Sequence, residues 1–320
     1  MPMAHETGTA SSETDLLQKL DTFLTTSTEL RATNEQWQRL YDHTTPASSA
    51  GDASRSVVWQ APGASGDDKI YIGAYTLSMT AGNIYNLCFC GGSMFSAAGV
   101  VYDDMHSGFI NISKDVVLFA DRRSFRYWFF ASGRRVIVVT GVNTVYSSAY
   151  CGFMLPVVTP PEYPCPLVIA GSASATTLRY SDTSDENSSI VDPRSKNFWL
   201  MYPDQGWRDI YGRRTSYGIG DYDKRYLTPN GAMRYMNNVL QTLTSLQASP
   251  GGIYPLFPVE IRSLEESGIN FLGALDGVFW LPGMGRASED TISSSDSHQY
   301  IVFQGGFRIT PVDYFAVEVC

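Results

Sequence analysis

The sequence is poor in the residues from which most catalytic and metal sites are built. Its 320 residues include four histidines and five cysteines, and charged residues make up 17% of the chain, against about a quarter in ordinary soluble domains. No phosphate-binding loop, dinucleotide-binding glycine motif or G-x-S-x-G motif is present. We therefore predict that the chain is not an enzyme and that it needs no cofactor and no metal.

Other absences exclude whole classes of partner. The net charge is −9 and no basic run occurs, which argues against nucleic-acid binding. No uninterrupted apolar run reaches the length of a membrane span, so we expect no membrane insertion. The opening MPMAHETGTASSETD has no basic region followed by an apolar one, so we expect synthesis in a cytoplasm. The cysteines are odd in number and widely spread, which does not suit a disulfide framework.

What the sequence does contain is aromatic residues, at 13% of the chain with 19 tyrosines. Short β-like segments are separated by turn residues at the spacing typical of sandwiches and barrels. Segment 69–79 shows the alternation most clearly, because Ile70 and Ile72 fall on one face and Tyr71 and Tyr75 on the other. The predicted fold is mainly β, with antiparallel sandwich or barrel-like sheets and a short N-terminal helical region.

Composition divides the chain into segments. Leucines spaced three and four apart predict a helix over 14–24, and Trp37, Leu40 and Tyr41 suggest a second one over 33–42. Five prolines mark an extended crossing rather than a central strand. The predicted order is a disordered arm (1–12), a helical docking segment (13–45), a first β domain (55–155), the proline-rich crossing (156–166) and a second β-rich half (167–320), which is either separate or continuous with the first. A helix over 230–246 is also expected.

The segment from Phe125 to Pro156 combines five aromatic residues with a possible nucleophile motif. Phe125, Tyr127 and Phe129 are expected on one face of a strand, with Trp128 and Phe130 on the other. A turn at Ser132–Gly133 is expected to place Arg134 and Arg135 at a solvated or contact edge. The apolar run 136–139 predicts a strand buried on both sides. Whether Trp128 and Phe130 face this chain's own core or the next subunit stays open.

Three small polar residues in this segment resemble nucleophiles. Ser147, Ser148 and Cys151 have no base beside them in the sequence and no loop of the oxyanion type. We therefore interpret them as small residues that let sheets approach closely. Because triad partners meet in space rather than in sequence, a Ser–His–Asp or Cys–His triad stays a minor alternative.

Two short motifs carry weak metal signals. Cys88 and Cys90 alternate onto one strand face, but zinc ligands usually come as C-x2-C with a second such pair, so buried core thiols are the favoured interpretation. Asp103, Asp104 and His106 could ligate a cation together with Asp115 or Asp121, although a solvated loop is the favoured interpretation. The acidic stretch 182–186 lacks the glycine and carboxylate spacing of an EF-hand loop and is interpreted as solvated.

A second aromatic segment, 198–226, interleaves tryptophan, tyrosine, aspartate and arginine. This composition marks protein interfaces, and it also suits a sugar site where rings stack on pyranoses. The candidate interface or glycan contacts are Trp128, Phe130, Trp199, Tyr202, Trp207, Tyr211, Tyr217 and Tyr222. The carboxylates for glycoside cleavage would be Asp204, Asp209, Asp221 and Asp223.

Several segments resemble virion structural proteins of tailed bacteriophages. In chain order these are TDLLQKLDTFL, GDDKIYIGAYTL, the block from ASGRRVIVVTGVNTVYSSAYCGFMLP to VVTPPEYPCPLVIAGS, LDGVFWLPG and YIVFQGGFRITPVDYFAVEV. The resemblance extends from about Thr14 to Val319 and is weakest over 31–56 and 172–250. Its most specific part is 133–171. The family supplies no catalytic motif that maps onto this chain.

The resemblance implies a tail, baseplate or collar component located in the virion. Its partners would be further copies of itself, as a homo-oligomer, and neighbouring virion proteins. Sparse charge and tyrosine-rich surfaces suit such assembly. A host-surface glycan recognition module is the alternative, and a glycan-degrading enzyme is a weaker one.

Overall fold

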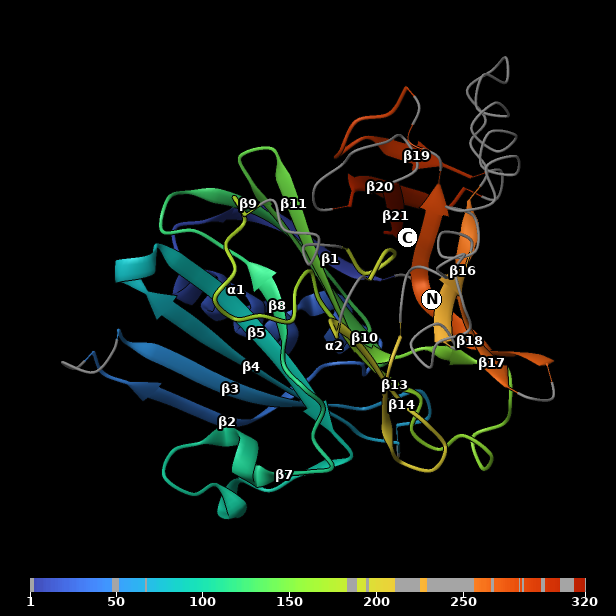
Figure 1. Cartoon of the computed structure of the whole chain (residues 1–320), viewed down its shortest axis with the longest axis horizontal. Coiled ribbons are helices and arrows are strands. Elements are labelled where there is room, and N and C mark those ends of the chain that lie inside the picture. Colours follow the sequence, from blue (N-terminus) through green and yellow to red (C-terminus); the bar gives the residue numbers. More distant parts are fainter. Residues whose placement is uncertain are drawn as a thin grey trace.

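The structure is a computed structural model that describes residues 3–47, 52–66, 68–182, 189–193, 196–210, 225–228, 256–265, 268–281, 283, 285–294, 297–305 and 314–319. Antiparallel sheets dominate it, as the sequence predicts. Three large sheets form layers, and the middle one is covered on both faces (Figure 1). No helix in the described ranges is long and apolar enough to cross a membrane.

The first sheet contains five strands, which lie side by side in the order β2 (Gln38–Thr45), β3 (Ser54–Ala61), β4 (Ile70–Met79), β5 (Ile84–Gly92) and β8 (Val116–Phe119). The central sheet runs β1 (Ala4–Ala10), β9 (Phe125–Ala131), β10 (Arg135–Val142), β11 (Val145–Phe153), β13 (Leu167–Ala170), β14 (Phe198–Met201) and β15 (Trp207–Asp209). It takes strands from both sides of the proline-rich crossing, so one sheet unites the two halves of the chain.

The third sheet, which we call the C-terminal sheet, has the order β16 (Arg225–Thr228), β17 (Phe257–Glu265), β18 (Gly268–Leu281), β21 (Tyr314–Glu318), β20 (Gln299–Gln304) and β19 (Thr291–Ser293). The short β12 (Leu155–Pro156) pairs with β18. A separate two-stranded sheet is formed by β6 (Met94–Phe95) and β7 (Phe109–Ile110). The short 3-10 helices are η1 (Thr80–Gly82), η2 (Ala97–Gly99) and η3 (Met105–Gly108).

The central sheet is apolar on both faces because each face lines a different core. Phe125, Tyr127 and Phe129 pack into the core shared with the first sheet, whereas Trp128 and Phe130 pack into the core shared with the C-terminal sheet. This confirms the alternation predicted for the segment. The run 136–139 divides in the same way and is buried on both sides, as expected.

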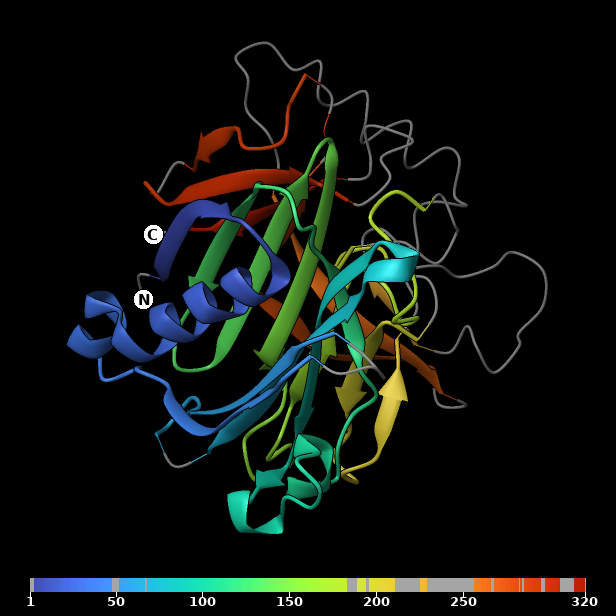
Figure 2. The ribbon, with the colours of Figure 1, turned by 90° about the vertical axis from the view of Figure 1, so that its left-hand side faces the viewer.

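Helix α1 (Glu13–Thr26) lies against the first and central sheets and fills the open side of the core between them (Figure 2). Ser12 begins it, because its side chain accepts a hydrogen bond from the backbone N–H of Asp15 at 3.1 Å. Leu16, Leu20 and Leu24 are fully buried in the core. The predicted helix over 14–24 is therefore confirmed.

The prediction of a second helix over 33–42 is wrong. Helix α2 (Thr28–Ala32) is a single turn or so, and Asn34 then takes a left-handed conformation with φ of 60°. The backbone continues into strand β2 instead of a helix over 33–42. Trp37 explains the misleading spacing, because it is buried in the core and its indole N–H donates to the carbonyl of Ser132 at 2.9 Å.

The predicted disordered arm is also wrong over its described part. Strand β1 forms the edge of the central sheet, in register with β9 from Ala4 opposite Ala131 to Ala10 opposite Phe125. Small and polar residues suffice here because an edge strand buries few side chains. The helix expected over 230–246 lies outside the described residues.

Arg135 corrects a third prediction. It is 3% exposed rather than at a solvated edge. Its guanidinium lies 3.5 Å from the Asp276 carboxylate and also donates to the Asp276 carbonyl, while Arg134 pairs with the same carboxylate at 2.7 Å. The two arginines therefore join the central sheet to the C-terminal sheet by ion pairs with Asp276.

A second buried ionic cluster fastens α1 to the first sheet. Asp21, which is 1% exposed, accepts hydrogen bonds from Arg39 at 2.6 Å, Arg55 at 3.0 Å and the indole of Trp59 at 2.9 Å. Arg55 also binds both oxygens of Asp42 at 2.9 and 2.8 Å. Every charge in this cluster therefore has a partner of opposite sign.

Candidate functional site

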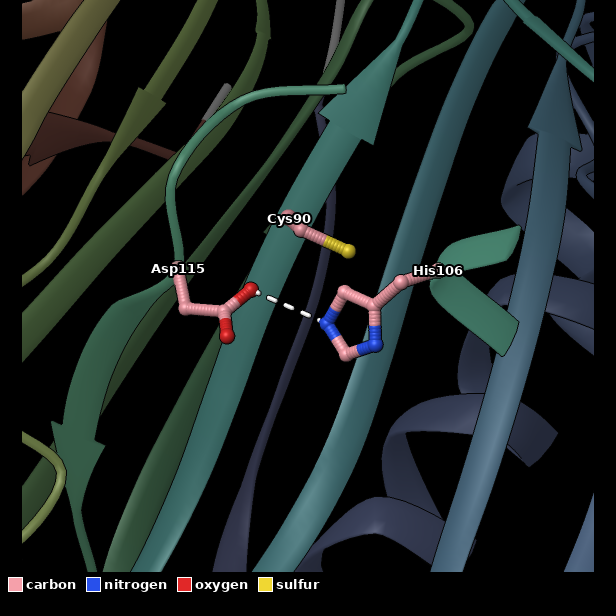
Figure 3. A group of neighbouring side chains, drawn as sticks. All are labelled: Cys90, His106 and Asp115. Carbon is pink, nitrogen blue, oxygen red and sulfur yellow. Dashed lines mark hydrogen bonds and ion pairs between the residues drawn. The ribbon is translucent and has the colours of Figure 1, made fainter. Parts of the chain in front are cut away.

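Three side chains with metal-ligating chemistry meet on the outer face of the first sheet. Cys90 lies on β5, His106 on η3, and Asp115 in the segment that leads into β8. One ligand atom of each lies within 4.8 Å of the others. The thiol points toward the imidazole ring, and the Asp115 carboxylate lies beside the ring at Nε2 (Figure 3). We call these three residues the Cys90 cluster.

The excursion between β5 and β8 supplies two of the three residues. Residues 93–113, which we call the knob, project from the sheet as the β6–β7 hairpin with η2 and η3 (Figure 2). Phe95, Met105 and Phe109 anchor the knob in a small core that also contains Cys90. This anchoring places His106 over the sheet, where its ring meets Tyr75 edge-on at 5.4 Å.

The imidazole is held at both nitrogens. Nδ1 lies 2.8 Å from an Asp104 oxygen, and the same oxygen accepts the backbone N–H of His106 at 3.1 Å. Nε2 lies 3.2 Å from one oxygen of Asp115, whose other oxygen accepts the hydroxyl of Tyr75 at 2.8 Å. Asp104 therefore fixes the orientation of the His106 ring, and Tyr75 fixes that of the Asp115 carboxylate.

The charges follow from this arrangement. The hydrogen bond to Asp115, with a contribution from Cys90, raises the pKa of His106 to about 11. Burial raises the pKa of the Cys90 thiol to about 11, and the neighbouring imidazole only partly opposes this rise. Without a bound ion, His106 is therefore an imidazolium and Cys90 a neutral thiol at pH 7.

The same observations argue against nucleophilic catalysis. Catalytic cysteines are partly exposed and have a lowered pKa, whereas the Cys90 thiol is fully buried and its pKa is raised. Ser147 and Ser148 are also buried, and each hydroxyl accepts a backbone N–H, from Phe119 at 3.0 Å and Ile190 at 3.2 Å. Burial likewise raises the pKa of Cys151. These three residues are therefore placed as packing residues, in line with the sequence interpretation.

Every member of the Cys90 cluster is a candidate ligand in the sequence, but no sequence pattern joins the three residues. Cys90 was paired with Cys88, whose side chain instead packs against Val117 and Phe119. His106 was grouped with Asp115 or Asp121, and only Asp115 reaches it. Asp121 binds Arg123 at 2.6 Å. Asp103 is turned toward His43, at 3.7 Å.

Two of the candidate contact residues are buried within this chain. Trp128 is 3% exposed and Phe130 is fully buried, and both rings meet Phe303 of the C-terminal sheet edge-on, at 5.2 and 6.2 Å. The open question about their orientation is thereby answered, because they face this chain's own core. Neither is available for contact with another subunit or a glycan.

The second aromatic segment does not form one platform. Trp199 and Trp207 pack against the core of the first and central sheets, whereas Tyr202 packs against the other core. Both indole N–H groups are already used, by the carbonyls of Lys196 and Asn111. Tyr211, Tyr217 and Tyr222 lie outside the described residues.

The carboxylates considered for glycoside cleavage are paired with arginines where they are described. Asp204 binds Arg208 at 2.8 Å, and Asp209 binds Arg225 at 3.1 Å. Asp221 and Asp223 lie outside the described residues. Each described carboxylate of this set is therefore already bound by a guanidinium.

Exposed apolar side chains gather in two places. Among the described residues, nine large hydrophobic residues are exposed, and four of them lie on the knob: Met94, Val101, Tyr102 and Ile110. Four more form what we call the ridge: Leu155, Val157, Val158 and Phe271. The ridge lies where the proline-rich crossing runs along β18, with the N–H of Val157 donating to the Leu272 carbonyl at 3.2 Å.

No protein-family model matches this sequence, and no curated protein is significantly similar to it.

Proposed function

We propose that this chain is a structural protein of a tailed-bacteriophage virion, made in the cytoplasm of the bacterial host. It would assemble with further copies of itself and with neighbouring virion proteins in the tail, baseplate or collar region. The resemblance described for segment 133–171 and its flanking segments motivates the choice of family.

The observation that carries the proposal is the concentration of exposed apolar side chains on the knob and the ridge. Tyr102 on the knob is 98% exposed, and Met94 and Ile110 form a cross-strand pair whose members are 55% and 57% exposed. Isolated exposed hydrophobic residues are ordinary, but gathered ones mark contact surfaces. Two such surfaces on one chain suit a subunit that contacts more than one neighbour.

The rest of the molecule supports a binding role over a catalytic one. Ser147, Ser148 and Cys151 are buried packing residues, and the buried charges at Asp21 and Asp276 hold layers together. Charged residues are scarce at 17% of the chain, which lowers the desolvation cost of covering a wide surface.

The experiment that tests the proposal follows the chain into particles. Tyr102→Ser with Ile110→Ser alters the knob, and Val157→Ser with Val158→Ser alters the ridge. Met79→Ser is the control, because Met79 is the ninth exposed hydrophobic residue and lies on neither surface. All variants should fold, since surface substitutions change stability by only about 0.5 kcal/mol.

We expect wild type and the Met79→Ser variant in purified particles, with the knob or ridge variant depleted. A wild-type chain that is absent from purified particles would overturn the proposal. Binding of the isolated chain to host polysaccharide on a glycan array, without incorporation into particles, would instead favour the recognition alternative.

A further inference from the structure

We propose that Cys90, His106 and Asp115 bind a zinc ion that fastens the knob to the first sheet. The inference is independent of the proposed function, because it concerns the chain's own fold and would hold for a protein of any role. The donor set combines a thiol, an imidazole and a carboxylate on three separate segments.

The distance between the nitrogen and oxygen donors suits a tetrahedral ion. Zinc binds histidine nitrogen and carboxylate oxygen at about 2.0–2.1 Å, so tetrahedral ligands of these two kinds lie about 3.3 Å apart. Nε2 of His106 and Oδ1 of Asp115 are 3.2 Å apart. A charge-assisted hydrogen bond between such groups is usually shorter, at about 2.7–2.9 Å.

The surroundings orient the donors as metal sites do. A ligating histidine usually gives its other ring nitrogen to a carboxylate, which fixes the tautomer and the ring plane. Asp104 does this at Nδ1, at 2.8 Å, and leaves Nε2 directed at Asp115. Tyr75 holds the remaining oxygen of Asp115 at 2.8 Å, so both ligands are positioned before an ion arrives.

The Cys90 cluster is buried at its thiol and partly open to solvent at its other two side chains. The thiol is fully buried, whereas the side chains of His106 and Asp115 are 34% and 28% exposed. An ion can therefore enter from the solvent side, and water can complete the four ligands. The mixed sulfur, nitrogen and oxygen donors favour zinc over magnesium or calcium, which take oxygen ligands.

The consequence of binding would be local. Cys90 belongs to a central strand of the first sheet, whereas His106 belongs to the knob, so an ion shared by them links the two directly. Binding to the folded form stabilises what it holds. The knob carries one of the two exposed apolar surfaces, and its rigidity would depend on the ion.

The test uses the full chain, first stripped with a chelator and then given zinc chloride or cobalt chloride alone. We expect one zinc per chain by elemental analysis after gel filtration. Cobalt should give visible bands of a tetrahedral ion and a near-ultraviolet charge-transfer band from the thiolate. Cys90→Ala should lose that band and the zinc. Cys151→Ala is the matched control, since it removes an equally buried thiol from another sheet.

Asp104→Asn tests the positioning residue. It should bind zinc about 10- to 100-fold more weakly while the cobalt spectrum keeps its shape, because the ligands themselves are unchanged. Folded wild-type protein that retains no more zinc than Cys90→Ala would overturn the proposal, and so would equal loss in Cys151→Ala.

Hydrogen exchange on wild type keeps the proposal testable even where a variant fails to fold. Zinc should slow amide exchange in residues 93–113 and leave the middle of α1 unchanged. Equal exchange of the knob with and without zinc would show that the cluster is only an ion pair.

Discussion

Two charged clusters in this molecule are built from similar parts and differ in how completely they are satisfied. The Asp21 carboxylate is almost fully buried and binds two arginines and an indole. The Asp115 carboxylate is partly exposed and binds one histidine at 3.2 Å and one tyrosine, beside the buried thiol of Cys90. The first arrangement is complete as it stands, whereas the second has donors directed at a common point. This difference separates a structural ion cluster from a ligand site more clearly than composition does.

Removal of Asp21 should have the largest effect. Asp21→Ala leaves Arg55, whose side chain is 8% exposed, with only Asp42 as a carboxylate partner. Breaking one side of a buried ion pair costs about 3–5 kcal/mol. Urea unfolding followed by far-ultraviolet circular dichroism would measure it. A loss below about 1 kcal/mol would mean that the cluster is solvated in solution.

The matching change in the second cluster should cost less in zinc-free protein. Asp115→Ala removes one of the two carboxylate partners of His106, but the imidazolium is about a third exposed and regains water. We expect a loss of about 2 kcal/mol, the size of a hydrogen bond to a charged group. The same urea titration with a chelator present measures it. A cost equal to that of Asp21→Ala would remove the distinction between the clusters.

Acid should weaken the first cluster through Asp42. The hydrogen bond from Arg55 lowers the pKa of Asp42 below its usual value, so the unfolded state binds more protons than the folded state near pH 4. Stability from this group is present above its unfolded pKa of about 3.9 and is lost as pH falls through the folded pKa. Thermal unfolding between pH 6 and about pH 2 should show a smaller decline in Asp42→Asn than in wild type. Parallel declines would contradict the expectation.

An exposed pair on the same helix supplies the smallest effect. Lys19 and Asp15 lie 2.6 Å apart with side chains about a third exposed. Lys19→Ala should change stability by about 0.5 kcal/mol or less, because solvent screens the pair. A shift in the urea midpoint as large as that of Asp115→Ala would show that exposure is a poor guide to these clusters.

The sequence predicted those parts of the fold that depend on local periodicity. The two-sided burial of Phe125–Ala131 follows from aromatic residues on both strand faces, and the leucine spacing located α1. Strand β1 was missed because its sequence, AHETGTA, contains little to bury, and its stability comes from hydrogen bonds to β9. The sequence suggests an edge position for Arg135 because no local signal shows that Asp276 of the C-terminal sheet faces it.

The Cys90 cluster shows the same limit for a site. Each residue was noticed, but a knob of about twenty residues separates Cys90 from Asp115, and its fold decides which carboxylate reaches His106. Asp115 does so, whereas Asp121 lies beyond β8 and binds Arg123. Spacing in the sequence favoured neither. The alternation of Cys88 and Cys90 was correct for the backbone, yet packing places only Cys90 beside the imidazole.

The pairing of β1 with β9 also has a consequence for synthesis. Glu6 and Tyr127, which hydrogen-bond across these strands at 2.8 Å, are 121 residues apart in the chain. At translation speeds of about 5–20 residues per second, β1 waits on the order of ten seconds for its partner strand to emerge from the ribosome. Helix α1 can form during that interval because its contacts along the chain are local. Strand β1 therefore joins the sheet late, although it is made before β9.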